Sequence, residues 1–385
     1  MLKSRFLMGR AARLVGLTCS LSVILAACSS SPSSPSSSTS SKGTTKNSAG
    51  VAAAEAVVQA AERPITFTKP TPNFAMSKNS GKTVWYIAPD MSIPFIATIA
   101  SGVKAAAAAA GMKAVIFDGK GQVNTFNQGV TEAVSQKASG IILQGINPAL
   151  VSGPLAQAKA AGIPVIDSLN GDPTQPLASG VLAHVTVNYT EGGKLMADWV
   201  IAASKGTAHV VVFTSSIYTI YQNMVAGFKE EFAKLCPSTC KIDAVENVQP
   251  TGVATQLGSI TSTAISRYPD AKYFVPFYDA MVTYMIPSIQ QVHANVAIIS
   301  HDGVTTNLDI IRKGGVQQAD VSNPPTAAMG WAEVDEIGRL IAGLKPAPED
   351  LPQQLFVKAN VGSSDAGLFS GYANYESEYK SVWGK

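Results

Sequence analysis

From Lys82 onward, short apolar segments alternate with helical ones, and this alternation restricts the possible folds more than any other feature of the chain. The predicted strands of this first series cover residues 83–88, 113–117, 140–144, 163–166 and 181–187. The predicted helices between them cover residues 94–110, 125–137 and 151–161. Short, continuously apolar strands separated by helices are typical of a parallel sheet that is covered on both faces.

The same alternation begins again at Gly192. The strands predicted in this second series cover residues 209–214, 242–246, 272–276, 296–300 and 316–321. The helices cover residues 192–203, 222–235, 255–268, 280–292, 308–313 and 327–343. Two series of similar length predict an α/β fold with two doubly wound parallel-sheet lobes. Because ligands bind beyond the carboxyl ends of the strands in such sheets, we expect a binding cleft between the lobes.

Length and charge agree with a two-lobed body and narrow its partners. The chain has 385 residues, of which 46% are apolar, which is enough material for two cores. Four of the 29 Lys and Arg residues precede Cys28, so 25 basic residues face 26 acidic ones from there on. A nearly neutral surface without a basic run argues against nucleic acid as a partner.

The N-terminus has the pattern of an export signal. A basic stretch at 1–13 precedes an apolar run at 14–27 that is short for a membrane span. The run ends Leu25-Ala26-Ala27-Cys28, which resembles a bacterial lipobox and implies cleavage of residues 1–27, a lipid anchor on Cys28 and an extracytoplasmic location. The alternative is an uncleaved signal anchor with an incidental cysteine.

Two further segments precede the first lobe. Residues 28–50 are rich in Ser, Thr, Pro, Gly and Lys and are predicted to form a flexible tether to the membrane. Residues 51–80 form an N-terminal extension, in which we expect a short helix at 51–62 followed by an extended, proline-containing stretch.

The remaining cysteines, Cys236 and Cys240, stand four residues apart in the second series. In an exported protein, this spacing predicts a local disulfide that holds a turn. A metal or redox role would need a CxxC pair or a second pair of ligands, and neither is present, so we expect no metal and no cofactor.

Several short motifs occur in an order that carries a family resemblance. They are Ser92-Ile93-Pro94-Phe95-Ile96, Ile146-Asn147-Pro148, Ala161-Gly162-Ile163-Pro164-Val165-Ile166, Gly192-Gly193-Lys194 and His301-Asp302-Gly303. With this order and spacing, the chain from Lys82 to about Gly343 resembles the type I periplasmic binding proteins, specifically the ribose- and galactose-like sugar receptors of ABC importers.

The resemblance implies a chain that crosses between its lobes three times through a hinge. The N-terminal lobe would comprise residues 81–187 plus 323–345, and the C-terminal lobe residues 188–322. Residues 346–385 contain three tyrosines and a tryptophan, so we expect this tail to pack on the body. The resemblance also implies a monomer that binds a small-molecule solute and docks on an ABC permease in the membrane.

Eight residues are candidate ligand contacts at positions matched to the family: Asp90, Phe95, Asn147, Asn170, Gln222, Tyr278, Asp302 and Asn323. Two arginines of the family pattern are replaced, one near Asn170 and one at Gln222. Without these arginines, the site lacks the groups that favour an anionic ligand. The resemblance, together with the two replacements, therefore predicts a small neutral solute, such as a sugar, a polyol or a related cyclic compound.

Each candidate also has a purely structural interpretation. Phe95 can pack at the start of a helix, Asn147 can cap one, and Asp302-Gly303 is common turn chemistry. Tyr278, like Tyr218 and Tyr221, can belong to the edge of the core.

The function predicted is therefore that of a solute-binding receptor of an ABC importer, and not of an enzyme. Ser80-Gly81-Lys82-Thr83 lacks the first glycine of a phosphate-binding loop, and no GxSxG or HExxH motif occurs. The alternative is an extracytoplasmic ligand sensor that presents its closed form to a membrane signalling partner.

Overall fold

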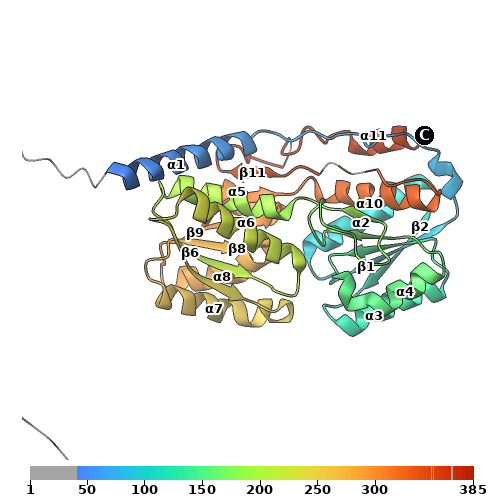
Figure 1. Cartoon of the computed structure of the whole chain (residues 1–385), viewed down its shortest axis with the longest axis horizontal. Coiled ribbons are helices and arrows are strands. Elements are labelled where there is room, and N and C mark those ends of the chain that lie inside the picture. The colour runs from blue at the N-terminus through green and yellow to red at the C-terminus, as the bar shows by residue number, and fades with distance from the viewer. Residues whose placement is uncertain (1–40, 348, 350, 366) are drawn as a thin grey trace, which may run out of the picture. The chain divides into compact units, whose positions relative to one another are not determined.

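The protein folds around two separate sheets (Figure 1). The computed structural model describes residues 41–347, 349, 351–365 and 367–385, so the predicted signal peptide and Cys28 lie outside the described residues. The first sheet has five strands and the second has six. The predicted α/β class with two parallel-sheet lobes is thereby confirmed.

The first sheet is wholly parallel, with the order β2-β1-β3-β4-β5. Its strands are β1 (Thr83–Ala88), β2 (Lys113–Asp118), β3 (Gly140–Gln144), β4 (Val165–Ser168) and β5 (Ala183–Val185). The helices that cover it are α2 (Pro94–Ala110), α3 (Val123–Ser135), α4 (Ser152–Ala160) and α10 (Thr326–Ile341) (Figure 1). Along β1, Val84 and Tyr86 pack into the cluster that contains α2 and α10, whereas Trp85 and Ile87 pack into the one that contains α3 and α4. A strand buried on both faces has to be apolar throughout, which is why β1 shows no polar alternation.

The second sheet has the order β11-β10-β9-β8-β6-β7. Its strands are β6 (His209–Thr214), β7 (Lys241–Asn247), β8 (Tyr273–Pro276), β9 (Ala297–Asp302), β10 (Gln317–Ser322) and β11 (Gln354–Val357). The helices of this lobe are α5 (Tyr189–Ala203), α6 (Thr219–Leu235), α7 (Val253–Arg267), α8 (Asp279–Gln291) and α9 (Thr305–Arg312). Only β11 runs antiparallel, on the outer edge of β10. This strand comes from the tail, where the apolar pattern did not predict one.

The chain passes between the two sheets three times. It leaves β5 of the first sheet for α5 of the second lobe, and it leaves β10 of the second sheet for α10, which packs on the first. After α10 it returns to the second sheet as β11. These three connections form the hinge region.

The N-terminal extension and the tail pack on this body. Helix α1 (Ser41–Ala61) begins inside the segment predicted as a flexible tether, so that prediction is wrong for residues 41–50. Ala54 and Val58 of α1 are buried, and a Cβ at Gly50 would overlap the carbonyl oxygen of Leu235. The tail ends in α11 (Tyr375–Val382) and Trp383, whose ring stacks on that of Trp331 of α10.

The predicted disulfide between Cys236 and Cys240 is present. It closes the turn between α6 and β7, and neither cysteine lines a cavity between the lobes. Within the part of the chain that the structure describes, none of the helices is both long and apolar enough to cross a membrane.

Candidate functional site

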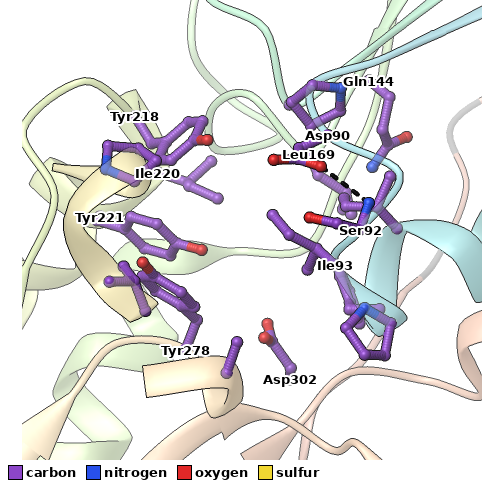
Figure 2. A pocket seen from close by; sticks show the side chains of 18 of the residues that line it. Asp90, Ser92, Ile93, Gln144, Leu169, Tyr218, Ile220, Tyr221, Tyr278 and Asp302 are labelled. Carbon is purple, nitrogen blue, oxygen red and sulfur yellow. Dashed lines mark hydrogen bonds between the residues drawn. The ribbon is translucent and has the colours of Figure 1, made fainter. Parts of the chain in front are cut away.

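A cavity of about 200 Å³ lies between the two lobes, where the strands of both sheets end (Figure 2). The first lobe contributes the loop after β1, the start of α2 and the ends of β3 and β4. The second contributes the starts of α5, α6, α7 and α8 and the end of β9. Its lining residues are Pro89, Asp90, Ser92, Ile93, Pro94, Phe95, Ile96, Gln144, Gly145, Leu169, Tyr189, Tyr218, Ile220, Tyr221, Pro250, Val253, Ala254, Tyr278, Ala280, Tyr284 and Asp302.

A second space of about 220 Å³ adjoins this cavity. Phe95, Tyr284 and Asp302 line both volumes, and the second is completed by residues of α8 and α9 such as Thr283 and Asn307. The site therefore extends from the tyrosine-rich cavity past Asp302.

One wall of the cavity consists of tyrosines from the second lobe (Figure 2). Tyr221 and Tyr278 stack with their ring centroids 5.1 Å apart, and Tyr218 meets Tyr221 edge-on at 5.5 Å. Burial raises the pKa of Tyr218 to about 12 and that of Tyr221 and Tyr278 above the usual value, so the three phenols stay neutral. Among the described residues their hydroxyls have no hydrogen-bond partner, which leaves an apolar wall with polar groups free for a ligand.

Asp302 forms the floor of the cavity at the end of β9. Its φ of 128° lies in a region that L-residues rarely adopt, and such strain is concentrated at functional sites. Oδ1 lies 3.2 Å from Nδ1 of His301, and Oδ2 accepts the N–H of Asp279 at 3.3 Å. Burial raises the pKa of the Asp302 carboxyl, while His301 opposes that shift.

A buried polar network lies behind Asp302. Ser300 hydrogen-bonds to the carboxylates of both Asp279 and Asp320, and Nε2 of Gln317 donates to Asp320 at 3.1 Å. Burial, followed by the charge of Asp320, raises the pKa of Asp279 well above its usual value. The raised pKa favours the neutral form of Asp279, and none of these four side chains, Asp279, Ser300, Gln317 and Asp320, gives a positive charge to the floor of the site.

On the first-lobe side, Asp90 and Gln144 supply the polar groups (Figure 2). Oδ1 of Asp90 accepts the N–H of Ser92 at 2.8 Å, which orders the turn that leads into α2. Gln144, the last residue of β3, is fully buried, and neither its Nε2 nor its Oε1 has a partner among the described residues. A buried amide with both ends unpaired is costly unless a ligand or water satisfies it.

Four of the eight candidate residues meet at the cavity: Asp90, Phe95, Tyr278 and Asp302. Asn147 instead caps the turn at Pro148–Val151 through Ala149, and its Nδ2 donates to Oγ1 of Thr219 across the cleft at 3.2 Å.

The other three candidates also lie outside the lining. Asn170 is buried in the loop after β4, next to Leu169, which does line the cavity. Gln222 lies on α6, and its Nε2 donates to the carbonyl of Ser216 at 2.7 Å. Asn323 is fully buried where the chain leaves β10, and its Oδ1 accepts from Gln353 at 3.2 Å.

Residues that the sequence did not single out are equally prominent in the lining. Gln144 ends β3 and Leu169 follows β4 directly, so the rule that ligands meet strand ends could have indicated them. Leu169 has a φ of 51°, which the sequence pattern does not signal.

In the described residues, one group of three acids lies close enough to share a metal ion: Asp335, Glu336 and Glu349. None of them lines the cavity between the lobes. All three carboxylates already have hydrogen-bond donors. Asp335 pairs with Arg339 at 2.6 Å, Glu336 accepts the N–H of Ala347 at 3.0 Å and Glu349 accepts from Tyr379 at 2.9 Å. Among the described residues that line it, the interlobe cavity has acceptors and aromatic rings but no group of three metal-ligating side chains.

Two parallel-sheet lobes, three connections and a ligand-sized cavity between the strand ends define a solute-binding protein of the two-lobed class. A family model described as "Periplasmic binding protein domain" matches residues 84–345, which is more than half of the chain. The chain belongs to this family of non-enzymatic solute-binding proteins. Membership implies an extracytoplasmic location.

Solved structures agree with this fold. The chain is similar to a solute-binding protein of an ABC transporter from Burkholderia graminis in complex with D-arabinose, with a TM-score of 0.66, 21% identity and coverage of 74% of this chain and 98% of that one. A 5-methylthioribose-binding protein from Thermotoga lettingae gives a TM-score of 0.69 at 14% identity, over 78% and 98% of the two chains. An ABC transporter solute-binding protein from Agrobacterium vitis with bound allitol gives a TM-score of 0.64 at 18% identity, with coverage of 73% of this chain and 97% of that one. No curated protein sequence is significantly similar to the chain.

Proposed function

We propose that this protein is the solute receptor of an ABC importer and that it captures a small neutral solute in the cavity between its lobes. The observation that carries the proposal is Gln144, which belongs to the lining of the cavity and whose two buried amide atoms have no partner in the described chain. An amide donates and accepts at once, so its natural partner is a solute with neighbouring donor and acceptor groups.

The charges of the lining support a ligand without negative charge. Asp90 and Asp302 are charged residues of the lining, and no Lys, Arg or His belongs to the described residues that form it. An anion would meet carboxylates with no compensating cation. Carboxylates accept hydrogen bonds well from hydroxyl groups, and tyrosine rings pack against the apolar face of a sugar or another ring. A sugar, a polyol or a related cyclic compound fits these groups.

The three connections suggest how binding is converted into transport. We propose that residues 81–187 plus 323–345 and residues 188–322 move as two bodies that close on the solute, and that the closed form docks on a membrane permease. A lipid on Cys28 would hold the protein, as a monomer, at the membrane surface. The Cys28 anchor and the tether up to α1 are part of this proposal.

The test is a thermal-shift screen of the protein without residues 1–28 against pentoses, hexoses, polyols and small aromatic compounds, followed by calorimetric titration. A ligand that binds only the folded state raises the Tm by mass action. At least one neutral solute is expected to do so, and Asp302→Ala should abolish the shift. Stabilisation by anionic solutes alone would overturn the proposal.

A further inference from the structure

The C-terminal tail places one side chain, Gln353, directly behind the floor of the ligand cavity. Its Nε2 lies 2.6 Å from Nε2 of His301 and 3.2 Å from Oδ1 of Asn323. Gln353 directly precedes β11 and lies beyond the residues 84–345 that match the family model. A segment outside the family domain therefore contacts the histidine next to Asp302.

These contacts favour one tautomer of His301. Nδ1 of His301 faces the carboxylate Oδ1 of Asp302 at 3.2 Å, and a carboxylate only accepts, so Nδ1 is the protonated nitrogen. Nε2 faces the amide nitrogen of Gln353, which only donates, so Nε2 carries no proton. His301 is completely buried, so water does not compete for either position.

The three connections between the lobes also come together around His301 and Asp302. The connection after β5 leads into Tyr189, whose ring centroid lies 5.5 Å from that of His301. The connection after β10 begins with Asn323, whose backbone N–H donates to the carbonyl of Asp302 at 3.3 Å. The connection after α10 ends at Gln353. If any of these connections moves when the lobes close, the contacts of His301 and Asp302 should change with it.

We infer that Gln353 is a positioning residue for ligand binding: it holds His301 in the neutral form protonated on Nδ1, and His301 in turn orients the Asp302 carboxylate toward the solute. The inference rests on the proposed function, because it assigns a ligand-binding role to Asp302. Through Gln353, the tail, which lies outside the family domain, would set how strongly the Asp302 carboxylate accepts hydrogen bonds from the solute.

The charged and titratable groups around His301 define what a change at position 353 should do. Asp302 is on the same strand, Asp279 is on α8, Asp320 is on the neighbouring strand β10, and Tyr189 is on α5. Gln353→Glu would replace the donor on Nε2 by an acceptor and add a further carboxylate. Both changes favour the doubly protonated imidazolium, which would bind the Asp302 carboxylate more tightly and weaken it as an acceptor for the solute.

The experiment is a pH titration of the imidazole nitrogens by ¹⁵N NMR, which is practicable because the chain has four histidines. His301 is assigned by difference from variants of the other three. The wild-type protein is expected to show an unprotonated Nε2 and a protonated Nδ1 at neutral pH, and Gln353→Glu is expected to show both nitrogens protonated. A protonated Nε2 in the wild-type protein would overturn the inference without any variant having to fold.

Gln354→Glu is the matched control. Gln354 is the next residue and is buried, whereas Gln353 is half-buried; its Oε1 accepts from the N–H of Ile65, and no hydrogen bond joins it to His301 within the described residues. This variant is expected to leave the His301 spectrum unchanged, and an equal change in both variants would overturn the inference.

Binding provides the second readout. For the pentose, hexose or polyol that binds the wild-type protein most tightly, Gln353→Glu should raise the Kd by roughly tenfold at pH 7, and Gln354→Glu by less than about twofold, in line with the strength of one hydrogen bond to a charged group. An unchanged Kd with an altered His301 spectrum would overturn the positioning role. If no solute binds the wild-type protein, the proposed function fails, whereas the ¹⁵N spectra still decide how Gln353 acts on His301.

Discussion

Gln144 allows a prediction in which stability and binding change in opposite directions. The side chain has no exposed surface, and both of its polar atoms lack partners among the described residues. Gln144→Met keeps an unbranched side chain of similar length but removes the amide. Methionine also adapts its shape to an irregular cavity wall, so the packing around β3 should survive the change. We expect the ligand-free protein to become more stable and solute binding to be lost.

The magnitude follows from the two unpaired atoms. Leaving a buried donor or acceptor unsatisfied costs about 1–3 kcal/mol, and partial rearrangement of the surroundings recovers some of that cost. A gain of about 1–2 kcal/mol in the free energy of unfolding is therefore expected for Gln144→Met. At roughly 2 °C per kcal/mol for a protein of this size, the ligand-free Tm should rise by about 2–4 °C.

Gln317→Met is the matched control, since Gln317 is also fully buried but is completely bonded. Its Nε2 donates to Ser300 and Asp320, and its Oε1 accepts from Asn307. The same substitution there should lower the Tm, because it leaves these partners unsatisfied. Differential scanning calorimetry and calorimetric titration measure both effects. A lower Tm for Gln144→Met together with unchanged solute binding would refute the reasoning, because it would show that the amide serves the fold.

Three further predictions concern the floor, the tail and the first lobe. Asp302→Asn should raise the Kd for the solute by roughly tenfold or more by titration calorimetry, while the ligand-free protein stays folded, because asparagine tolerates a positive φ and carries no buried charge. Trp383→Ala should lower the Tm by roughly 6 °C or more in a thermal melt, because it removes a buried ring stacked on Trp331 and leaves Asp335 without the indole N–H; a change below about 1 °C would show that the tail does not stabilise the body. Burial raises the pKa of Glu333 to about 8, so the stability contributed by its protonated form is present below pH 4.5 and is lost as the pH rises through about 8. Glu333→Gln should therefore have a higher Tm than the wild-type protein at pH 8 but not at pH 5, and equal Tm differences at both pH values would contradict this.

The strand–helix alternation was sufficient to predict the two lobes because it reports a physical requirement. Strands such as β1 and β3 are buried on both faces, so they have to be apolar throughout, and the helices between them follow from the crossover that parallel strands need. Helix starts were less accurate. Helix α5 begins at Tyr189, before the predicted Gly192, because the side chain of Asn188 caps it by accepting from the N–H of Glu191.

The strand in the tail was beyond prediction from the sequence pattern. β11 is a short edge strand that pairs on one side only, and a single strand of four residues has too few positions to show a period. Its place depends on β10, which lies more than thirty residues earlier in the chain. The same holds for Gln353, whose contact with His301 results from that pairing and from no local motif.

Three of the candidate residues that line the cavity end a strand or stand at the start of a helix. Asp302 ends β9, Phe95 is at the start of α2 and Tyr278 immediately precedes α8, so the topology alone brings them to the cleft. Asn323 and Gln222 were transferred by position, and position does not specify where a side chain points. Each has one amide atom bonded within the protein, since Oδ1 of Asn323 accepts from Gln353 and Nε2 of Gln222 donates to Ser216, while the buried Nδ2 of Asn323 has no partner among the described residues.

The distribution of hydrogen-bond partners in the cavity constrains the solute further than its shape does. Asp302 is an acceptor once ionised, its own donors are His301 and the N–H of Asp279, and the acids behind it supply no cation. Any solute that reaches the floor of the site must therefore present a hydrogen-bond donor to it. At the opposite wall, Gln144 needs a donor and an acceptor close together. Hydroxyl groups on adjacent carbons meet both needs at once, since each hydroxyl donates and accepts. The tyrosine wall then selects for a solute that also has an apolar face, and this combination favours a ring over an open chain.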